Sequence, residues 1–215
     1  MQHVKPRLYR DPVHDTVAFA PDRPEGRLVI ELLDTQEMQR LRHVRQLALS
    51  NLVYHGAEHT RFTQSVGVAW ITWRMLEQLR PHAKISTLER LEVLSAAVLH
   101  DVGHAPFSHA LEVLSGACHE HRASSIILDP SSEVHDVLAS FDTSLPTRVA
   151  AMFSGESRQR PFLRDIVSSQ LDADRFDYIL RDGRMTGVKI GQYDLERILA
   201  TLAVHDDHLA VHSGG

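Results

Sequence analysis

Hydrophobic residues recur every three or four positions along most of the chain, which is the spacing of amphipathic helices. This pattern predicts a helix over about residues 60–80, ended by Pro81, and another that Ser86 and Glu89 open as a capping box. We therefore expect a mainly helical protein. Further helical patterns cover roughly residues 109–114, 123–128, 133–141, 147–153, 164–182 and 194–203.

The N-terminal part of the chain follows two other patterns. In residues 1–33, β-branched residues alternate with Pro, Asp and Gly, which predicts a short strand or hairpin and then a connector. Asp34 and Glu37 resemble a capping box and predict a helix that continues to about Ala48. The arginines of QRLRHVRQ then form a solvated helix face, or else contact another subunit or a nucleotide.

At the other end, HDDHLAVH predicts a hairpin with its turn at Asp206–Asp207. No repeat, low-complexity tract or long linker interrupts the chain, so we expect an all-α fold with a small hairpin at each end. The expected single domain over 1–215 has an N-terminal hairpin region at 1–33, a helical core at 34–204 and a C-terminal hairpin at 205–215.

Composition narrows the class of protein. A chain of 215 residues with 43% hydrophobic residues can bury a core, and its apolar runs are too short for a membrane span. Cys118 is the only cysteine, so we expect a cytoplasmic protein without disulfides. The net charge of −5 does not favour broad binding to nucleic acid or to membrane, and local basic sites stay open. The 15 histidines are several-fold more than usual and indicate a site.

The stretch AAVLHDVGHAPFSHA places His100 and Asp101 side by side at the end of an apolar run. A divalent metal on helices needs ligands from more than one helix, because one helix face cannot surround an ion. A distant carboxylate is available in SSQLDADRFDYILRD, where Asp174, Tyr178 and Asp182 share one helical stripe. The pattern predicts a metal site between these two segments.

Four segments in this order, HTRFTQSVGVA, LHDVGHAPFSHALE, HEHRAS and DADRFDYILRD, resemble the HD-domain phosphohydrolases, in particular the deoxynucleoside triphosphate triphosphohydrolases. The likeness runs from about Tyr9 to the end of the chain. It implies an HD-domain helical bundle that binds one divalent ion, Mn, Fe, Mg, Ni or Zn. The implied reaction hydrolyses a dNTP to a deoxynucleoside and triphosphate, and we expect a homo-oligomer.

The resemblance also implies roles by position. His100, Asp101 and Asp174 match metal ligands, and His119 with Glu120 beside it matches a catalytic pair. Residues that match the lining of the triphosphate site are Arg61, His104, His109 and Arg175, and His104 also joins the catalytic set. Residues that match the sugar and base site are Gln46, Leu47, Tyr178 and Asp182, the last suited to accept a hydrogen bond from a 3′-hydroxyl.

One position departs from the family pattern. Where the family has a histidine as first metal ligand, this chain has Gln64, whose neutral carbonyl oxygen is a weaker donor for transition metals. His59, further upstream, is expected to point elsewhere. Three interpretations stay open: an engineered inactivating change, a natural pseudo-enzyme, or a site that keeps its metal through three ligands and water.

Two smaller departures concern the ends. Asp15 stands where the DPVH motif normally meets Gly, and the chain ends at Gly215, where the family usually continues with helices that complete the pocket. We therefore expect a truncated chain or a minimal variant. The prediction is a metal-dependent nucleotide phosphohydrolase, most simply acting on dNTPs. The alternatives are a non-catalytic nucleotide-binding module, or a phosphohydrolase of another substrate such as a nucleoside monophosphate or cyclic dinucleotide.

Overall fold

The computed structural model describes residues 5–107, 118–189 and 191–212. These residues are mostly helical with two small antiparallel hairpins, so the predicted fold class is confirmed. The expected helix at 109–114 lies outside them. The α-helices are α1 (Pro24–Asp34), α2 (Gln36–Gln39), α3 (Arg61–Leu79), α4 (Thr87–Leu99), α6 (His119–Leu128), α7 (Glu133–Phe141), α8 (Leu145–Ser154), α9 (Pro161–Asp165), α10 (Ala173–Thr186) and α11 (Leu195–Ala200). The strands are β1 (Arg7–Asp11), β2 (Asp15–Phe19), β3 (Leu202–His205) and β4 (His208–Val211), and short 3₁₀ helices cover Arg40–His43 and Ser50–Leu52.

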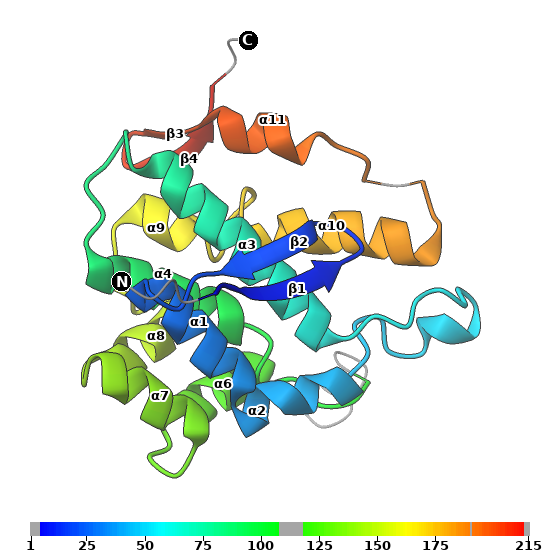
Figure 1. The fold of residues 1–215 in the computed structure, drawn as a ribbon, viewed down its shortest axis with the longest axis horizontal. Helices are drawn as coiled ribbons and strands as arrows, with labels where there is room; N and C mark the ends of the chain where they lie inside the picture. The colour runs from blue at the N-terminus through cyan, green and yellow to red at the C-terminus, as the bar shows by residue number, and fades with distance from the viewer. Residues whose placement is uncertain (1–4, 108–117, 190, 213–215) are drawn as a thin grey trace.

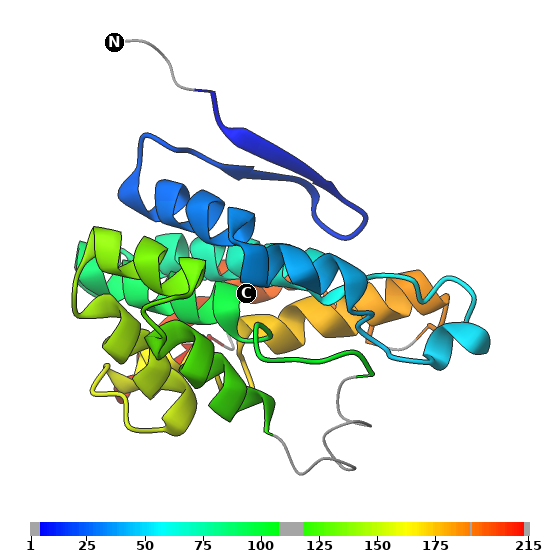
Figure 2. The same ribbon diagram turned by 90° about the horizontal axis from the view of Figure 1, so that it is seen from below.

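Helix α3 lies at the centre of the fold, with the β1–β2 hairpin on one side and α10 on the other (Figures 1 and 2). It also packs against α4, which in turn contacts α1 and α8. Trp70 and Trp73 of α3 meet Phe19 of the hairpin edge-on, with ring centroids 6.1 and 6.0 Å apart. The hairpin is thus fixed to the helical core by aromatic packing. No helix in the described part of the chain is long and apolar enough to cross a membrane.

The connector expected within residues 1–33 is wrong, because α1 occupies most of it. Pro24 stands in the first turn, where its fixed φ favours a helix and its missing N–H costs nothing. Leu28, Val29, Leu32 and Leu33 are fully buried and form the stripe that packs on the core. The Pro and Gly that indicated a loop therefore belong to the start of a helix.

The long helix expected from Asp34 is also wrong. Thr35 is the N-cap, and its side chain accepts a hydrogen bond from the backbone N–H of Met38. The α-helix is only four residues long and continues as a 3₁₀ turn. Arg45 then pairs with Thr60 in an isolated antiparallel bridge, so tertiary pairing takes this backbone out of helical geometry.

The single helix expected over 164–182 is two helices, α9 and α10. Asp172 interrupts the pattern because its carboxylate caps α10, accepting a hydrogen bond from the Arg175 backbone N–H at 2.7 Å. This break places Asp174 in the first turn of α10 rather than inside a longer helix.

At both hairpins the turn chemistry matches the sequence. Asp206 and Asp207 have φ of 48° and 64°, the left-handed geometry of a type I′ turn, so the predicted turn is confirmed. The strand before it begins at Leu202, slightly earlier than expected. Asp15 has φ of 57°, a conformation that favours glycine and that Asp adopts more readily than most other residues.

Candidate functional site

The predicted site residues gather around one cavity of about 540 Å³. Its walls come from the start of α3, the end of α4, the start of α6, the face of α10 and the segment after Val44. Gln64 lies beside the cavity, because it contacts Asp174. Arg175 is not among the lining residues of the cavity, and His109 lies outside the described residues. Predicted residues that line the cavity are Gln46, Leu47, Arg61, His100, Asp101, His104, His119, Glu120, Asp174, Tyr178 and Asp182.

His100 ends α4 and turns one ring nitrogen toward two carboxylates. Its Nδ1 donates a hydrogen bond to the carbonyl oxygen of Ala97 at 2.8 Å, which in a neutral ring leaves a lone pair on Nε2. Nε2 lies 3.4 Å from Asp101 Oδ2 and 3.4 Å from Asp174 Oδ1, and it is buried without a hydrogen bond. A buried ring nitrogen that faces two anionic oxygens is a position that a positive charge satisfies, either a proton on the ring or, on the neutral ring, a metal ion.

The charges of this cluster are strongly coupled. Burial lowers the pKa of His100, but the carboxylates of Asp101 and Asp174 raise it more, so its pKa lies well above the ordinary value. Burial raises the pKa of Asp101, but the neighbouring His100, His104 and Arg61 together lower it by more than burial raises it. The pKa of Asp101 therefore lies well below its ordinary value. The site therefore favours an ionised Asp101 beside a positive charge.

Helices α3 and α10 approach closely, and this approach brings Gln64 to Asp174. A Cβ on Gly67 would lie 1.9 Å from Asp177 Oδ1 and 2.4 Å from Arg181 Nη2, so only glycine allows the two helices to pack at this distance. One turn earlier on α3, the Gln64 amide donates a hydrogen bond to Asp174 Oδ1. Gln64 is fully buried and its Oε1 has no hydrogen-bond partner.

These donors fit a divalent ion by chemistry but not by their present arrangement. In the described ranges, no group of three His, Cys, Asp or Glu side chains has its donor atoms set around one ion. The carboxylates instead accept from N–H groups: Asp101 Oδ2 from Arg61 Nη1 at 2.6 Å, and Asp174 Oδ1 from Gln64. An ion held by His100, Asp101 and Asp174 would displace the Gln64 hydrogen bond, and rotation of that amide would then present the unpartnered Oε1.

Two imidazoles stack beside the carboxylates. His104 and His119 have ring centroids 4.0 Å apart and planes 14° apart, and His104 Nε2 lies 3.3 Å from Asp101 Oδ1. Burial lowers the pKa of His104, and the positive charge of Arg61 adds to this effect, while Asp101 opposes it. Gly103 permits the stacking, because a Cβ there would lie 2.0 Å from the backbone oxygen of His119 at the start of α6.

Arg40 supports the loop of the site, a role that the sequence pattern did not reveal. In the sequence it stands among the arginines of QRLRHVRQ, which are expected on one helix face. Its guanidinium donates to the backbone oxygens of Val102 at 2.6 Å and His104 at 2.7 Å. It therefore fixes the loop that follows His100 and Asp101, rather than forming a solvated face. Its guanidinium is half-buried, and this burial lowers its pKa.

One wall of the cavity is built by α10 and the segment at Gln46. Tyr178 and Asp182 lie one turn apart on α10, as the stripe predicted, and His59 contacts Asp182. As expected, His59 does not take the place of the missing metal ligand, because its ring bonds to Asp182 and it is not among the lining residues of the cavity. Lining residues that sequence reasoning missed are Met152, Phe153, Val167, Ser168 and Asp172, whose patterns indicated only helix core or loop.

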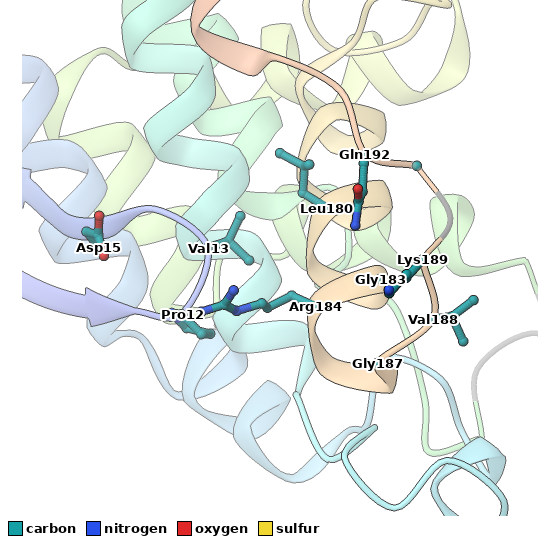
Figure 3. A pocket seen from close by; sticks show the side chains of 11 residues that line it. Pro12, Val13, Asp15, Leu180, Gly183, Arg184, Gly187, Val188, Lys189 and Gln192 are labelled. Carbon is teal, nitrogen blue, oxygen red and sulfur yellow. The ribbon is translucent and has the colours of Figure 1, made fainter.

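A second cavity, of about 530 Å³, lies between the β1–β2 turn and the C-terminal end of α10 (Figure 3). Pro12 and Val13 line it on one side, and Arg184 and Lys189 on the other. It holds none of the predicted site residues and none of the histidine or carboxylate cluster. The cluster of His100, Asp101 and Asp174 therefore belongs to the first cavity.

The profile of the HD domain family matches residues 61–178, which include the whole His100, Asp101 and Asp174 cluster. The chain is an HD domain protein. The HD match begins at Arg61, the first residue of α3, and ends at Tyr178 on α10.

Among curated proteins, the HD domain chain is similar to YwfO, an uncharacterized protein of Bacillus subtilis, at 38% identity over 97% of this chain and 47% of the relative. It is similar to the deoxynucleoside triphosphate triphosphohydrolase SAMHD1 of Gallus gallus at 26% identity over 90% of this chain and 36% of the relative. A crystal structure of a phosphohydrolase from Bacteroides thetaiotaomicron matches with a TM-score of 0.81 and 32% identity over 96% of this chain and 49% of that one. The chain thus spans about half the length of these relatives or less.

Proposed function

We propose that the protein is a metal-dependent nucleotide phosphohydrolase that cleaves a dNTP into a deoxynucleoside and triphosphate. The observation that carries the proposal is the convergence, in one cavity, of the His100, Asp101 and Asp174 cluster with the stacked His104–His119 pair. Similarity to SAMHD1 and to a solved phosphohydrolase supports the same reaction class.

We assign the phosphates of the substrate to the side of Arg61 and its sugar to the side of α10. Arg61 lies at one wall beside Asp101, and a guanidinium suits phosphate oxygens. Asp182 lies at the α10 wall, and its carboxylate would repel phosphate but accept a hydrogen bond from a hydroxyl. A nucleotide would therefore bind with its phosphates toward Arg61 and its sugar toward α10.

In the proposed reaction water attacks the α-phosphorus, the bond from phosphorus to the 5′-oxygen breaks, and that oxygen takes a proton. A divalent ion bound by His100, Asp101 and Asp174 would polarise the phosphoryl group and lower the pKa of attacking water. His119 serves as general acid or base, with its ring held by stacking on His104. Arg61 offsets the charge that develops on the phosphoryl oxygens.

A second candidate function is a nucleotide-binding module without turnover. The hydrogen bond from the Gln64 amide to Asp174 favours this candidate, because it satisfies a metal-ligating carboxylate without an ion. Both candidates use the same cavity. They differ only in whether the metal displaces the amide.

The test compares the wild-type chain with Gln64→His, incubated with Mn²⁺ and each of the four dNTPs, with release of triphosphate as the readout. We expect triphosphate from at least one dNTP, and Gln64→His to bind Mn²⁺ more tightly by roughly tenfold or more, since imidazole is the stronger ligand. Gln78→His is the matched control, because Gln78 lies on the same helix outside this cavity.

Absence of triphosphate from both the wild type and Gln64→His would reject the enzyme. Nucleotide binding in those same samples would then select the non-catalytic module. An equal gain in metal affinity for Gln78→His would show that an added surface histidine, and not the site, binds the metal.

A further inference from the structure

His59 contacts two segments that line the cavity, the one at Gln46 and helix α10. It precedes the N-cap of α3, and its side chain is only 2% exposed. Its Nε2 lies 2.8 Å from Asp182 Oδ1 on α10, and its backbone oxygen accepts a hydrogen bond from the Gln46 N–H at 3.0 Å. One buried residue therefore links the Gln46 segment to the α10 wall.

The hydrogen-bond pattern defines which atom of the imidazole carries the proton. His59 Nδ1 is buried without a hydrogen-bond partner, so a proton placed there would have no acceptor. The ring therefore donates through Nε2 to Asp182 Oδ1. This bond is between a nearly fully buried ring and a carboxylate whose side chain is 27% exposed.

The bond leaves one oxygen of Asp182 for the cavity. Within the described residues, Asp182 Oδ2 accepts no hydrogen bond from the protein, and Asp182 lines the cavity beside Tyr178. A carboxylate held through one oxygen presents the other in a defined direction, whereas a free carboxylate rotates. A fixed acceptor of this kind recognises a hydroxyl or amino donor and rejects phosphate.

We infer that His59 is a positioning residue that orients Asp182 to accept a hydrogen bond from a hydroxyl of the substrate sugar. The inference rests on the proposed function and names a determinant of its selectivity. A site built to hydrogen-bond a hydroxyl discriminates strongly against an analogue that lacks it, because the acceptor is then left unsatisfied. His59 would thus set selectivity without touching the nucleotide.

The experiment measures the affinity of each dNTP and of the matching 2′,3′-dideoxynucleoside triphosphate, by titration calorimetry with Ca²⁺ present. The variants are His59→Ala, His59→Gln, whose amide N–H reaches about as far as Nε2, and Asp182→Asn. His55→Ala is the matched control, because His55 is an exposed histidine of the same segment. Thermal unfolding of each variant checks that the chain folds.

We expect the wild type and His55→Ala to prefer the dNTP by roughly tenfold or more. The preference should fall close to one in His59→Ala and Asp182→Asn, recover in part in His59→Gln, and fall no further in the double variant His59→Ala/Asp182→Asn. Affinity for the dideoxy analogue should change little, which a purely structural role would not produce.

Equal weakening of both ligands in His59→Ala would overturn the inference, and so would an unchanged preference. A loss confined to nucleotides with an amino group on the base, sparing dTTP, would assign Asp182 to the base and also overturn it. Wild-type protein that binds both ligands equally and still releases triphosphate rejects only this inference. Wild-type protein that binds neither rejects the proposed function as well.

Discussion

Replacement of Arg181 by methionine tests the buried ion network that attaches the N-terminal hairpin to α10. Arg181 is fully buried, and its guanidinium donates to Asp177 at 2.7 and 2.9 Å and to Asp11 at 2.8 Å. Asp11 also accepts from the backbone N–H groups of Val13 and His14, and the His14 ring bonds to Asp177 at 2.7 Å. The DPVH motif therefore attaches the hairpin to α10 through an ion network, whose central positive charge is the Arg181 guanidinium.

The expected loss of stability follows from the charges that the substitution leaves behind. Methionine retains much of the apolar stem, but the carboxylates of Asp177 and Asp11 stay buried without their cation. Breaking a buried ion pair in this way costs about 3–5 kcal/mol. For a chain of this length each kcal/mol lowers Tm by roughly 2–4 °C, so Arg181→Met should unfold about 6–20 °C below the wild type.

The loss should also depend on pH in a defined direction. Burial raises the pKa of Asp11, but Arg181 and the two backbone N–H groups lower it more, so its folded pKa lies below the ordinary value. In the wild type this stability is present above the unfolded pKa and lost as pH falls through the folded one. In Arg181→Met the burial of Asp11 is no longer offset by the guanidinium, so the folded-state pKa of Asp11 is raised. The free energy of unfolding of this variant therefore increases as pH falls and Asp11 becomes protonated. The difference in unfolding free energy should therefore narrow as pH falls from 7 to about 4.

Urea unfolding at several pH values measures this difference directly. The matched control is Arg7→Met, because Arg7 pairs with Asp34 at the surface, with side chains 40% and 49% exposed, and such a pair contributes only about 0–1 kcal/mol. Two results would contradict the role of this ion network: a loss of unfolding free energy in Arg181→Met no larger than in Arg7→Met, or a loss that grows as the pH is lowered.

Two smaller changes test other contacts. Gly67→Ala would place a Cβ 1.9 Å from Asp177 Oδ1, so α3 and α10 would have to separate. We expect the free energy of unfolding to fall by about 1–3 kcal/mol and Mn²⁺ binding to weaken. An unchanged Tm and an unchanged metal affinity would contradict the close approach of the two helices. Ser86→Ala removes a hydrogen-bonded capping box and should lower the unfolding free energy by about 1 kcal/mol in urea titrations, against a smaller effect for Ser140→Ala within α7.

Where local signals agree with burial, the sequence predicts the elements well. The helix expected over 133–141 has those bounds in the structure, and the capping box at Ser86 and Glu89 opens α4 as expected. The two hairpins also follow from turn residues that accept positive φ. These features depend on interactions between residues close in sequence, which a pattern can reveal.

The errors arise where distant contacts override local patterns. Arg45 leaves the predicted helix to pair with Thr60, and Arg40 turns from a supposed solvated face to the carbonyl oxygens of Val102 and His104. Spacing along one helix cannot reveal such partners, because they depend on how loops return to the core. The same reason hid His59, whose partner Asp182 is far away in the chain.

Gln64 shows how a single side chain can decide between the two candidate functions. Its amide nitrogen bonds to Asp174 Oδ1, the oxygen that lies 3.4 Å from His100 Nε2, so it would compete with a cation bound between these two side chains. A neutral imidazole and an amide both carry a donor and an acceptor, so either can donate to the carboxylate without an ion. The imidazole nitrogen is the stronger ligand for a transition metal, so the amide favours the hydrogen bond over the ion more than a histidine would. In that arrangement Gln64 Oε1 is buried without a hydrogen-bond partner, which costs free energy. Rotation of the amide would turn Oε1 toward a cation and so remove this cost. We therefore expect the affinity of the proposed metal site to depend on the difference between these two amide orientations, and to be weaker than in Gln64→His.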